Sequence, residues 1–71
     1  DLGIGTEMIN TLIERARAIG LKVLILSAFA TNERARHVYQ AVGFSETGRI
    51  PKKFLKEGKY IDEILMATVL E

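Results

Sequence analysis

Two glycines near the start of the chain have a spacing that could bind a phosphate group. Gly3 and Gly5 stand directly before a helical pattern that begins at Thr6. A helix N-terminus leaves amides unpaired and carries a partial positive charge, and glycine lets a ligand approach the backbone closely. The pair could therefore hold a phosphate, and it could also be the ordinary start of a helix.

Two common phosphate-binding motifs do not fit these glycines. A dinucleotide-binding loop would have a third glycine where this sequence has Met8, and an acidic residue near the end of the next strand, which here ends in Ser-Ala-Phe. A nucleotide-triphosphate loop would continue as Gly-Lys-Ser or Gly-Lys-Thr, whereas Gly5 is followed by Thr6. Both interpretations are excluded.

The elements around the glycines follow from the spacing of apolar residues. Residues 1–20 are expected to form a loop and a helix that Gly20 caps, with an apolar stripe of Met8, Ile9, Leu12, Ile13, Ala16 and Ile19. Residues 22–28 contain an uninterrupted branched run that is typical of a strand buried on both faces. A helix followed by a buried strand is half of a β-α-β unit, so a strand is expected before Gly3.

A second helix and a hairpin complete the pattern. Asn32, or Thr31 before it, can cap a helix over residues 32–42, which Gly43 ends. Residues 44–70 are expected to form a hairpin whose first arm is limited by Pro51 and whose turn lies near Gly58. The order loop, α, β, α, β, β predicts an α/β chain with two helices and a mixed, mostly antiparallel three-stranded sheet.

The composition indicates a folded domain and narrows its chemistry. The 71 residues allow one domain at most, and 48% apolar with 27% charged residues argue against disorder. A net charge of +1 gives no case for nucleic acid or an anionic membrane as the main partner. The absence of cysteine excludes disulfides and a cysteine acyl-enzyme, and it agrees with a cytoplasmic location.

Four stretches of the sequence resemble the GNAT superfamily of acyl-CoA-dependent N-acyltransferases. They are G-I-G-T-E-M at residues 3–8, V-L-I-L-S-A at 23–28, N-E-R-A-R-H-V-Y-Q-A-V-G-F at 32–44 and G-K-Y-I-D-E-I-L-M at 58–66. The resemblance implies a partial GNAT fold in which residues 1–71 are the C-terminal half of the domain. The missing half would include the strand before Gly3, whose amide polarises the thioester carbonyl in this family.

The resemblance also implies an acyl-CoA site at the glycine pair. The family loop reads Arg or Gln, two residues, then G-x-G, so its Arg or Gln would be the residue before Asp1. Amides that would hold the pyrophosphate are those of Leu2, Gly3, Ile4, Gly5 and Thr6. Asn32 would face the pantetheine arm or act as a plain helix cap, and Arg34 and Arg36 would reach the 3′-phosphate of CoA or lie in solvent.

Tyr39 matches the family tyrosine that is assigned as the general acid. A phenol is protonated at neutral pH and could give its proton to the departing thiolate, although Tyr39 could also be a core aromatic. His37 lies on a different helix face and is expected in solvent. Asp62 and Glu63 alternate on a strand and cannot form a carboxylate pair; either could help a substrate amine or be a paired surface charge.

The resemblance implies an N-acetyltransferase that moves an acetyl group from acetyl-CoA directly to a primary amine of a small molecule or peptide, without a metal. The alternative is a catalytically incomplete half-domain, inactive alone, that associates through the exposed strand edge near Val23. The basic group from Arg49 to Lys59 could attract an acidic substrate or form a soluble hairpin surface.

Overall fold

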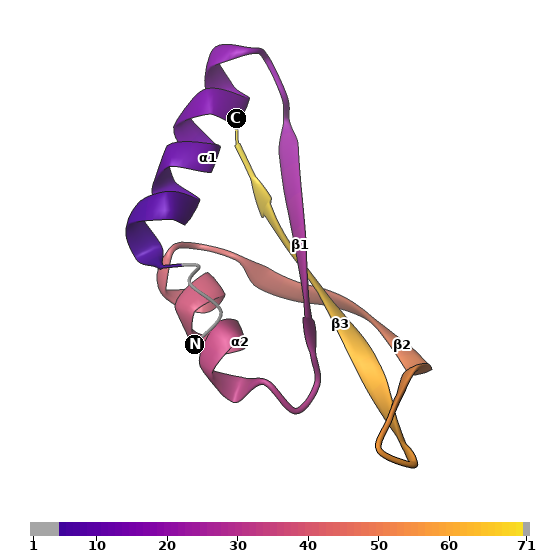
Figure 1. Ribbon diagram of the computed structural model, residues 1–71. Coiled ribbons are helices and arrows are strands. Elements are labelled where there is room, and N and C mark those ends of the chain that lie inside the picture. The colour runs from indigo at the N-terminus through magenta and orange to yellow at the C-terminus, as the bar shows by residue number, and fades with distance from the viewer. Residues whose placement is uncertain (1–4, 71) are drawn as a thin grey trace.

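The computed structural model describes residues 5–70, which form two helices and three strands (Figure 1). In chain order the elements are α1 (Thr6–Ala18), β1 (Val23–Phe29), α2 (Glu33–Ala41), β2 (Ser45–Lys56) and β3 (Lys59–Val69). The predicted order of helices and strands is confirmed. The three strands form one sheet in the order β1-β3-β2, and both pairings are antiparallel, so the described sheet contains no parallel pair.

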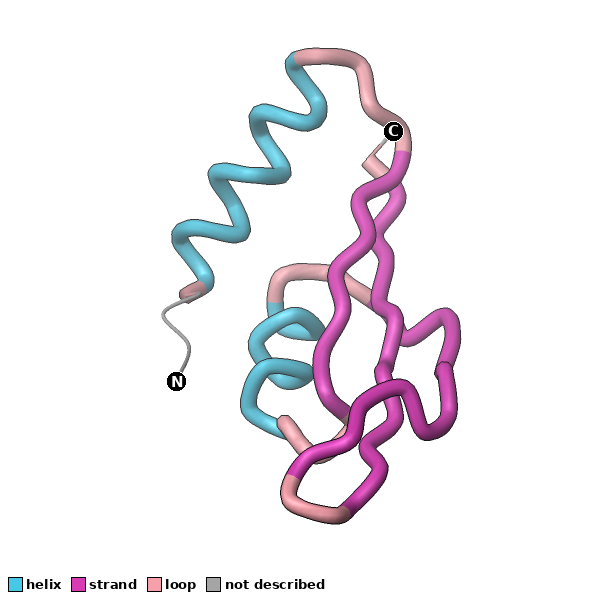
Figure 2. The backbone as a smooth tube through the Cα atoms, turned by 45° about the vertical axis from the view of Figure 1, so that its right-hand side comes forward, coloured by secondary structure: helices cyan, strands magenta, loops and turns pink. Residues whose placement is uncertain are grey.

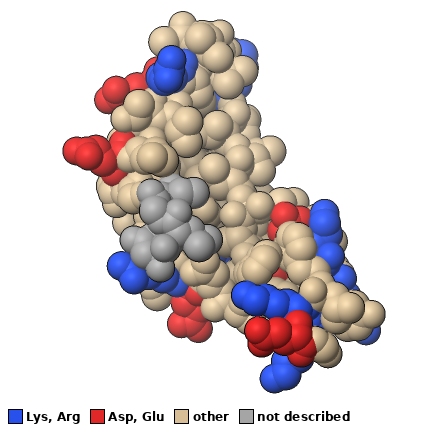
Figure 3. Space-filling model, in the orientation of Figure 1, with Lys and Arg blue, Asp and Glu red and all other residues tan. Residues whose placement is uncertain are grey.

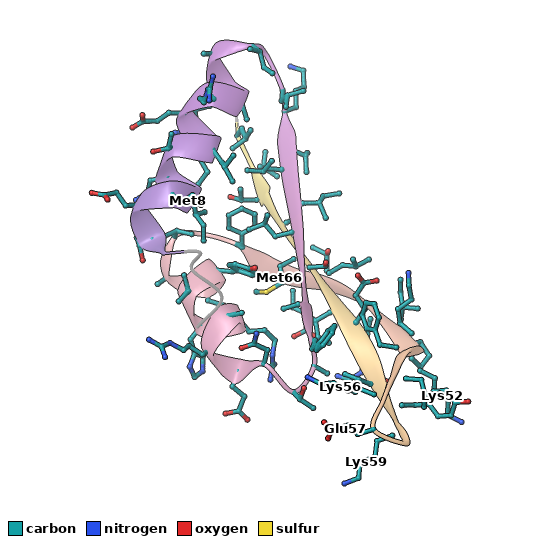
Figure 4. All side chains as sticks on the ribbon, viewed as in Figure 1. Met8, Lys52, Lys56, Glu57, Lys59 and Met66 are labelled. Carbon is teal, nitrogen blue, oxygen red and sulfur yellow. The ribbon has the colours of Figure 1, made fainter. Side chains whose placement is uncertain are left out.

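Both helices pack on the same face of this sheet (Figures 1 and 2). The core between the two layers consists of Ile9, Ile13, Ala16, Tyr39, Phe44, Ile64, Met66 and Leu70. Met66 points from β3 toward α2 and is completely buried (Figure 4). Ile64, two residues before Met66, faces the helices as well, because alternate side chains of a strand point to the same face.

Helix α1 buries a narrower stripe than its sequence suggests. Ile9, Ile13 and Ala16 are buried, whereas Met8, Leu12 and Ile19, although apolar and helically spaced, are exposed. Only one side of the helix contacts the sheet, so the outer half of the apolar stripe is uncovered in residues 5–70. Gly20, with φ of +87°, follows the helix end as predicted.

The expectation that β1 is buried on both faces is wrong for the described chain. Leu24, Leu26 and Ala28 pack against the core on the helical side. Val23 and Ile25 point the other way, and Ile25 is 62% exposed. The reason is that both helices lie on one face, and β1 is also an edge strand whose only neighbour among the described residues is β3.

The β2–β3 hairpin is longer and less regular than expected. Strand β2 continues through Pro51, which is tolerated because β2 is the other edge of the sheet. Its pairing with β3 shifts register between Ile50 and Phe54, so that extra residues of β2 bulge out. Glu57 and Gly58 form the turn with positive φ of 51° and 79°. The hairpin tip extends away from both helices in a molecule 42 Å long (Figure 2).

Candidate functional site

Asn32 and Tyr39, which the sequence assigns to one acyl-CoA site, line the same pocket at the end of β1. The pocket has a volume of about 160 Å³. Its lining residues are Ser27, Ala28, Phe29, Asn32, Ala35, Tyr39, Phe54 and Glu63. They come from the last residues of β1, from α2 with its cap, and from the hairpin.

Residues on both faces of the sheet contribute to this pocket. Ala28 packs on the helical side with Tyr39, whereas Ser27 and Phe29 alternate to the opposite face. On that face Phe29 is in register with Glu63 of β3, and its ring centroid lies 4.7 Å from that of Phe54. The pocket therefore reaches around the unpaired edge of β1 and has two sides. The helical side includes Ala28 and Tyr39, and the hairpin side includes Phe29, Phe54 and Glu63.

Tyr39 belongs to the core and to the pocket at once. Its residue surface is 6% exposed, and its ring centroid lies 6.1 Å from that of Phe44. The backbone N–H of Phe44 donates to the Tyr39 carbonyl at 3.0 Å, which fixes the end of α2. Tyr39 is thus a core aromatic, as one of its two interpretations predicts, and it also lines the pocket. The general-acid role stays a prediction.

Asn32 is the N-cap of α2, as one of its two interpretations predicts. Its Oδ1 accepts a hydrogen bond from the backbone N–H of Ala35 at 3.0 Å. The cap occupies the oxygen and leaves the side-chain N–H donors for another partner. A contact between Asn32 and a pantetheine arm stays a prediction.

Arg34, Arg36 and His37 lie on α2 outside the pocket lining. Arg36 is half-buried and its Nη2 donates to the Ala30 carbonyl at 3.0 Å, which ties the end of β1 to α2. Its Nε is buried and has no hydrogen-bond partner within residues 5–70. Arg34 and His37 are exposed. The structure thus gives Arg36 a structural contact that the sequence did not indicate.

The predicted pyrophosphate site is only partly within the described residues. Leu2, Gly3 and Ile4 lie outside them, and Gly5 and Thr6 lie at the start of α1. Gly5 is the N-cap, with φ of −98° and no side-chain cap. Any residue can adopt this φ, so strain does not explain a glycine here. A Cβ on Gly5 would meet nothing within 4 Å, which leaves open space at the helix N-terminus.

The pocket also contains Ser27, Phe29 and Phe54, which sequence patterns did not select, and Glu63, which the sequence offered together with Asp62 as a possible aid to a substrate amine. The Glu63 side chain is 14% exposed, and Oε1 lies 3.5 Å from Nζ of Lys53. Lys53 and Lys56 lie about 6 Å over the rings of Phe54 and Phe29. The sequence signal for Glu63 was strand alternation, which puts its side chain on the opposite face from Asp62.

Charged side chains gather over the hairpin end of the molecule (Figure 3). Within residues 5–70, no group of three or more His, Asp and Glu side chains is placed to hold a metal ion. In the same range, neither helix has the length and apolar character needed to cross a membrane.

Comparisons with known proteins agree with the fold and show the family. The matching family model, the acetyltransferase (GNAT) family, covers residues 1–44. The L-methionine sulfoximine/L-methionine sulfone acetyltransferase of Pseudomonas aeruginosa and the L-amino acid N-acyltransferase MnaT of Escherichia coli are 32% and 29% identical over 69 residues, 97% of this chain. The yncA acetyltransferase structure from Salmonella typhimurium, solved with its cofactor acetyl-CoA, matches 99% of the chain with a TM-score of 0.89 and 26% identity.

The chain therefore belongs to the GNAT family of acetyltransferases. It spans 40% of the length of each of these three relatives. The architecture agrees with the C-terminal part of their shared fold, and the family supports an acyltransferase class of enzyme that uses acetyl-CoA.

Proposed function

We propose that residues 1–71 are the C-terminal half of an N-acetyltransferase domain that transfers an acetyl group from acetyl-CoA directly to a primary amine of a small molecule or peptide. The observation that carries the proposal is the meeting of Asn32 and Tyr39 in one pocket at the unpaired edge of β1. The names of the relatives support a small amine acceptor of the amino acid kind.

The helical side of the pocket would hold the acyl donor. The amides of residues 2–6 would bind its pyrophosphate at the positive end of α1. The N–H donors of Asn32 would bind the pantetheine arm, which places the thioester next to Tyr39. Arg34 and Arg36 are the proposed contacts of the 3′-phosphate, although for Arg36 this requires leaving the Ala30 carbonyl.

In the transfer step the amine nitrogen forms a bond to the thioester carbonyl carbon and the bond from that carbon to sulfur breaks. The nitrogen attacks as the neutral amine and releases one proton to water. The Tyr39 hydroxyl gives its proton to the departing thiolate, and the resulting phenolate recovers a proton from water. Residues 1–71 contain no cysteine that could form an acyl-enzyme, which supports direct attack as far as this half of the domain is concerned. We place the reaction in the cytoplasm, which the same lack of cysteine supports.

A second candidate is a half-domain that is inactive alone and associates through β1. Its support is the free edge of this strand, which carries exposed Val23 and Ile25. In the first proposal the same edge pairs with the parallel strand expected before Gly3, and the two strands splay apart at the end of β1, where the pocket lies. The two candidates therefore differ in what covers β1.

Titration calorimetry with acetyl-CoA separates the two candidates. We expect weak or no binding by the 71-residue chain and measurable binding by a chain extended through the preceding strand. Tight binding by the short chain would show that the preceding strand is not needed. Equal absence of binding in both chains would remove the acetyltransferase proposal and favour the second candidate.

Tyr39→Phe in the complete domain tests the general acid. The ring that packs on Phe44 stays and only the hydroxyl is lost, so kcat should fall about 10²-fold or more while the affinity for acetyl-CoA changes little. His37→Ala is the control, because His37 is exposed on the same helix outside the pocket. An unchanged kcat would remove Tyr39 as the acid.

A further inference from the structure

We infer that Glu63 binds the amino group of the acceptor, on the side of the pocket opposite the helices, and that the acceptor is a primary alkylammonium. The inference rests on the proposed acetyl transfer, because it takes the pocket at the end of β1 as the reaction site. Of the two carboxylates that the sequence offered for a substrate amine, it selects Glu63, which lines the pocket, over Asp62, which does not.

The position of Glu63 makes it the acidic group of this pocket. It lies on β3, the central strand, in register with Phe29 of β1 and with Ile50 of β2. Its side chain is 14% exposed and lines the same pocket as Tyr39. A carboxylate that is largely removed from water needs a cationic or hydrogen-bonding partner.

The cation that pairs with Glu63 in this chain is Lys53, and the pair is weak. Lys53 Nζ lies 3.5 Å from Glu63 Oε1, and the Lys53 side chain is 47% exposed. Such a pair with a long, solvent-exposed lysine contributes little. A ligand cation that is better enclosed by the pocket could therefore displace Lys53 from Glu63.

Lys53 is itself a primary amine on an apolar carbon chain. Its ammonium lies 3.5 Å from Glu63 Oε1 and 6.0 Å from the ring centroid of Phe54. The paired rings of Phe29 and Phe54 supply an apolar surface beside that position. Carboxylate, aromatic surface and ammonium together match the chemistry of an alkylammonium acceptor. Lys53 lies beside the pocket lining, and in the free protein its ammonium is the cation paired with Glu63.

The arrangement also separates the two substrates. Asn32 and Tyr39 lie on the helical side, where the donor is proposed to bind, and Glu63 lies on the opposite side with Phe29 and Phe54. Glu63 binds and orients the alkylammonium, which must release one proton to water before its nitrogen can attack. Glu63 is therefore a binding residue with no part in the proton transfer to sulfur.

The test uses the complete domain with butylamine as the acceptor probe, and measures kcat and both KM values. Glu63→Gln should raise the KM for butylamine about tenfold or more and leave the KM for acetyl-CoA unchanged, since a hydrogen-bonded charge is lost. Lys53→Met should lower the KM for butylamine by about two- to fivefold, because the internal competitor is removed. Lys59→Met is the matched control, exposed at the hairpin tip, and should change neither value.

Binding without acetyl-CoA keeps the test independent of turnover. Butylammonium is titrated into the wild-type domain and the Glu63→Gln variant, and chemical shifts of residues around the pocket are followed by NMR. Saturable binding by the wild type that Glu63→Gln weakens supports the inference, even where no acetyl transfer occurs. No saturable binding, or equal binding by both proteins, overturns it, while acetyl-CoA calorimetry decides the proposed function separately.

Discussion

Asp62 holds the backbone of Lys52 in a left-handed conformation. The Asp62 Oδ1 accepts a hydrogen bond from the Lys52 amide at 2.9 Å, and Lys52 has φ of 56°. The same carboxylate accepts from Arg49 Nε at 2.7 Å through Oδ2. One side chain of the central strand therefore fixes the bulge of β2 that precedes Lys53 and Phe54, the residues beside the hairpin side of the pocket.

Acid should loosen this bulge before it unfolds the core. The hydrogen bond from the Lys52 backbone, followed by that from Arg49, holds the pKa of Asp62 below its ordinary 3.8. A lowered folded-state pKa means that the ionised carboxylate stabilises the hairpin above the unfolded-state pKa, and that this is lost as pH falls through the lowered value. An NMR acid titration should show the Lys52 amide shift changing below pH 3.8.

Asp62→Asn is the control for this titration. The variant has no carboxylate at position 62, so the acid-dependent shift of the Lys52 amide should disappear. A shift of the same size and midpoint in Asp62→Asn would mean that another group controls the bulge.

Substitutions in the hairpin turn should change stability only through the backbone conformation that each residue prefers. Glu57 has φ of 51°, which asparagine tolerates better than glutamate, so Glu57→Asn should stabilise the domain by about 0.5 kcal/mol. Gly58→Ala should destabilise it by about 1 kcal/mol, because φ is 79° although a Cβ there would meet nothing. Urea unfolding measures both, and equal stability of Gly58→Ala and wild type would contradict the turn geometry.

Asn32 variants should separate capping from donor binding. Asn32→Asp keeps an acceptor for the Ala35 amide, so the free energy of unfolding should change little. It removes the N–H donors, so the KM for acetyl-CoA should rise in the complete domain. Asn32→Ala should lose about 1 kcal/mol of stability as well. If Asn32→Asp leaves that KM unchanged, the residue is a cap and no more.

The core between the sheet and the helices should be sensitive to truncation at β3. Ile64 is completely buried, so Ile64→Ala should destabilise the domain by about 2–5 kcal/mol. Leu55, on the hairpin, is 65% exposed, and Leu55→Ala should cost less than about 1 kcal/mol. Similar losses for both variants in urea unfolding would mean that the hairpin face is covered.

Local patterns predicted most of the fold, because caps and apolar periodicity are properties of short segments. The α2 cap at Asn32 and the turn at Gly58 occur where the sequence places them. The prediction that β1 is buried on both faces was wrong for the described residues. An apolar run shows that both faces of a strand can be buried, but it does not show which segments bury them. The bulge before Phe54 was missed because it depends on a side-chain contact across the hairpin, from Asp62 of β3 to the Lys52 amide of β2, which strand periodicity does not show.

In the candidate site, too, residues close in sequence were predicted and residues brought together by the sheet were not. Asn32 and Tyr39 are close in sequence on one helix, so a motif could pair them. Phe29, Phe54 and Glu63 come from three strands, and only the register of the sheet brings them together. The order of those strands in the sheet could not be predicted from the sequence. The hairpin side of the pocket, which depends on that order, could therefore not be predicted either.

The extended hairpin offers a convenient place to observe this protein in solution. Lys59 lies at its tip, away from the helices (Figure 4). The sequence contains no cysteine, so Lys59→Cys would introduce a single thiol for a fluorescent dye without further substitutions. The anisotropy of such a dye would report how rigidly the arm is held, and whether an occupied pocket stiffens it.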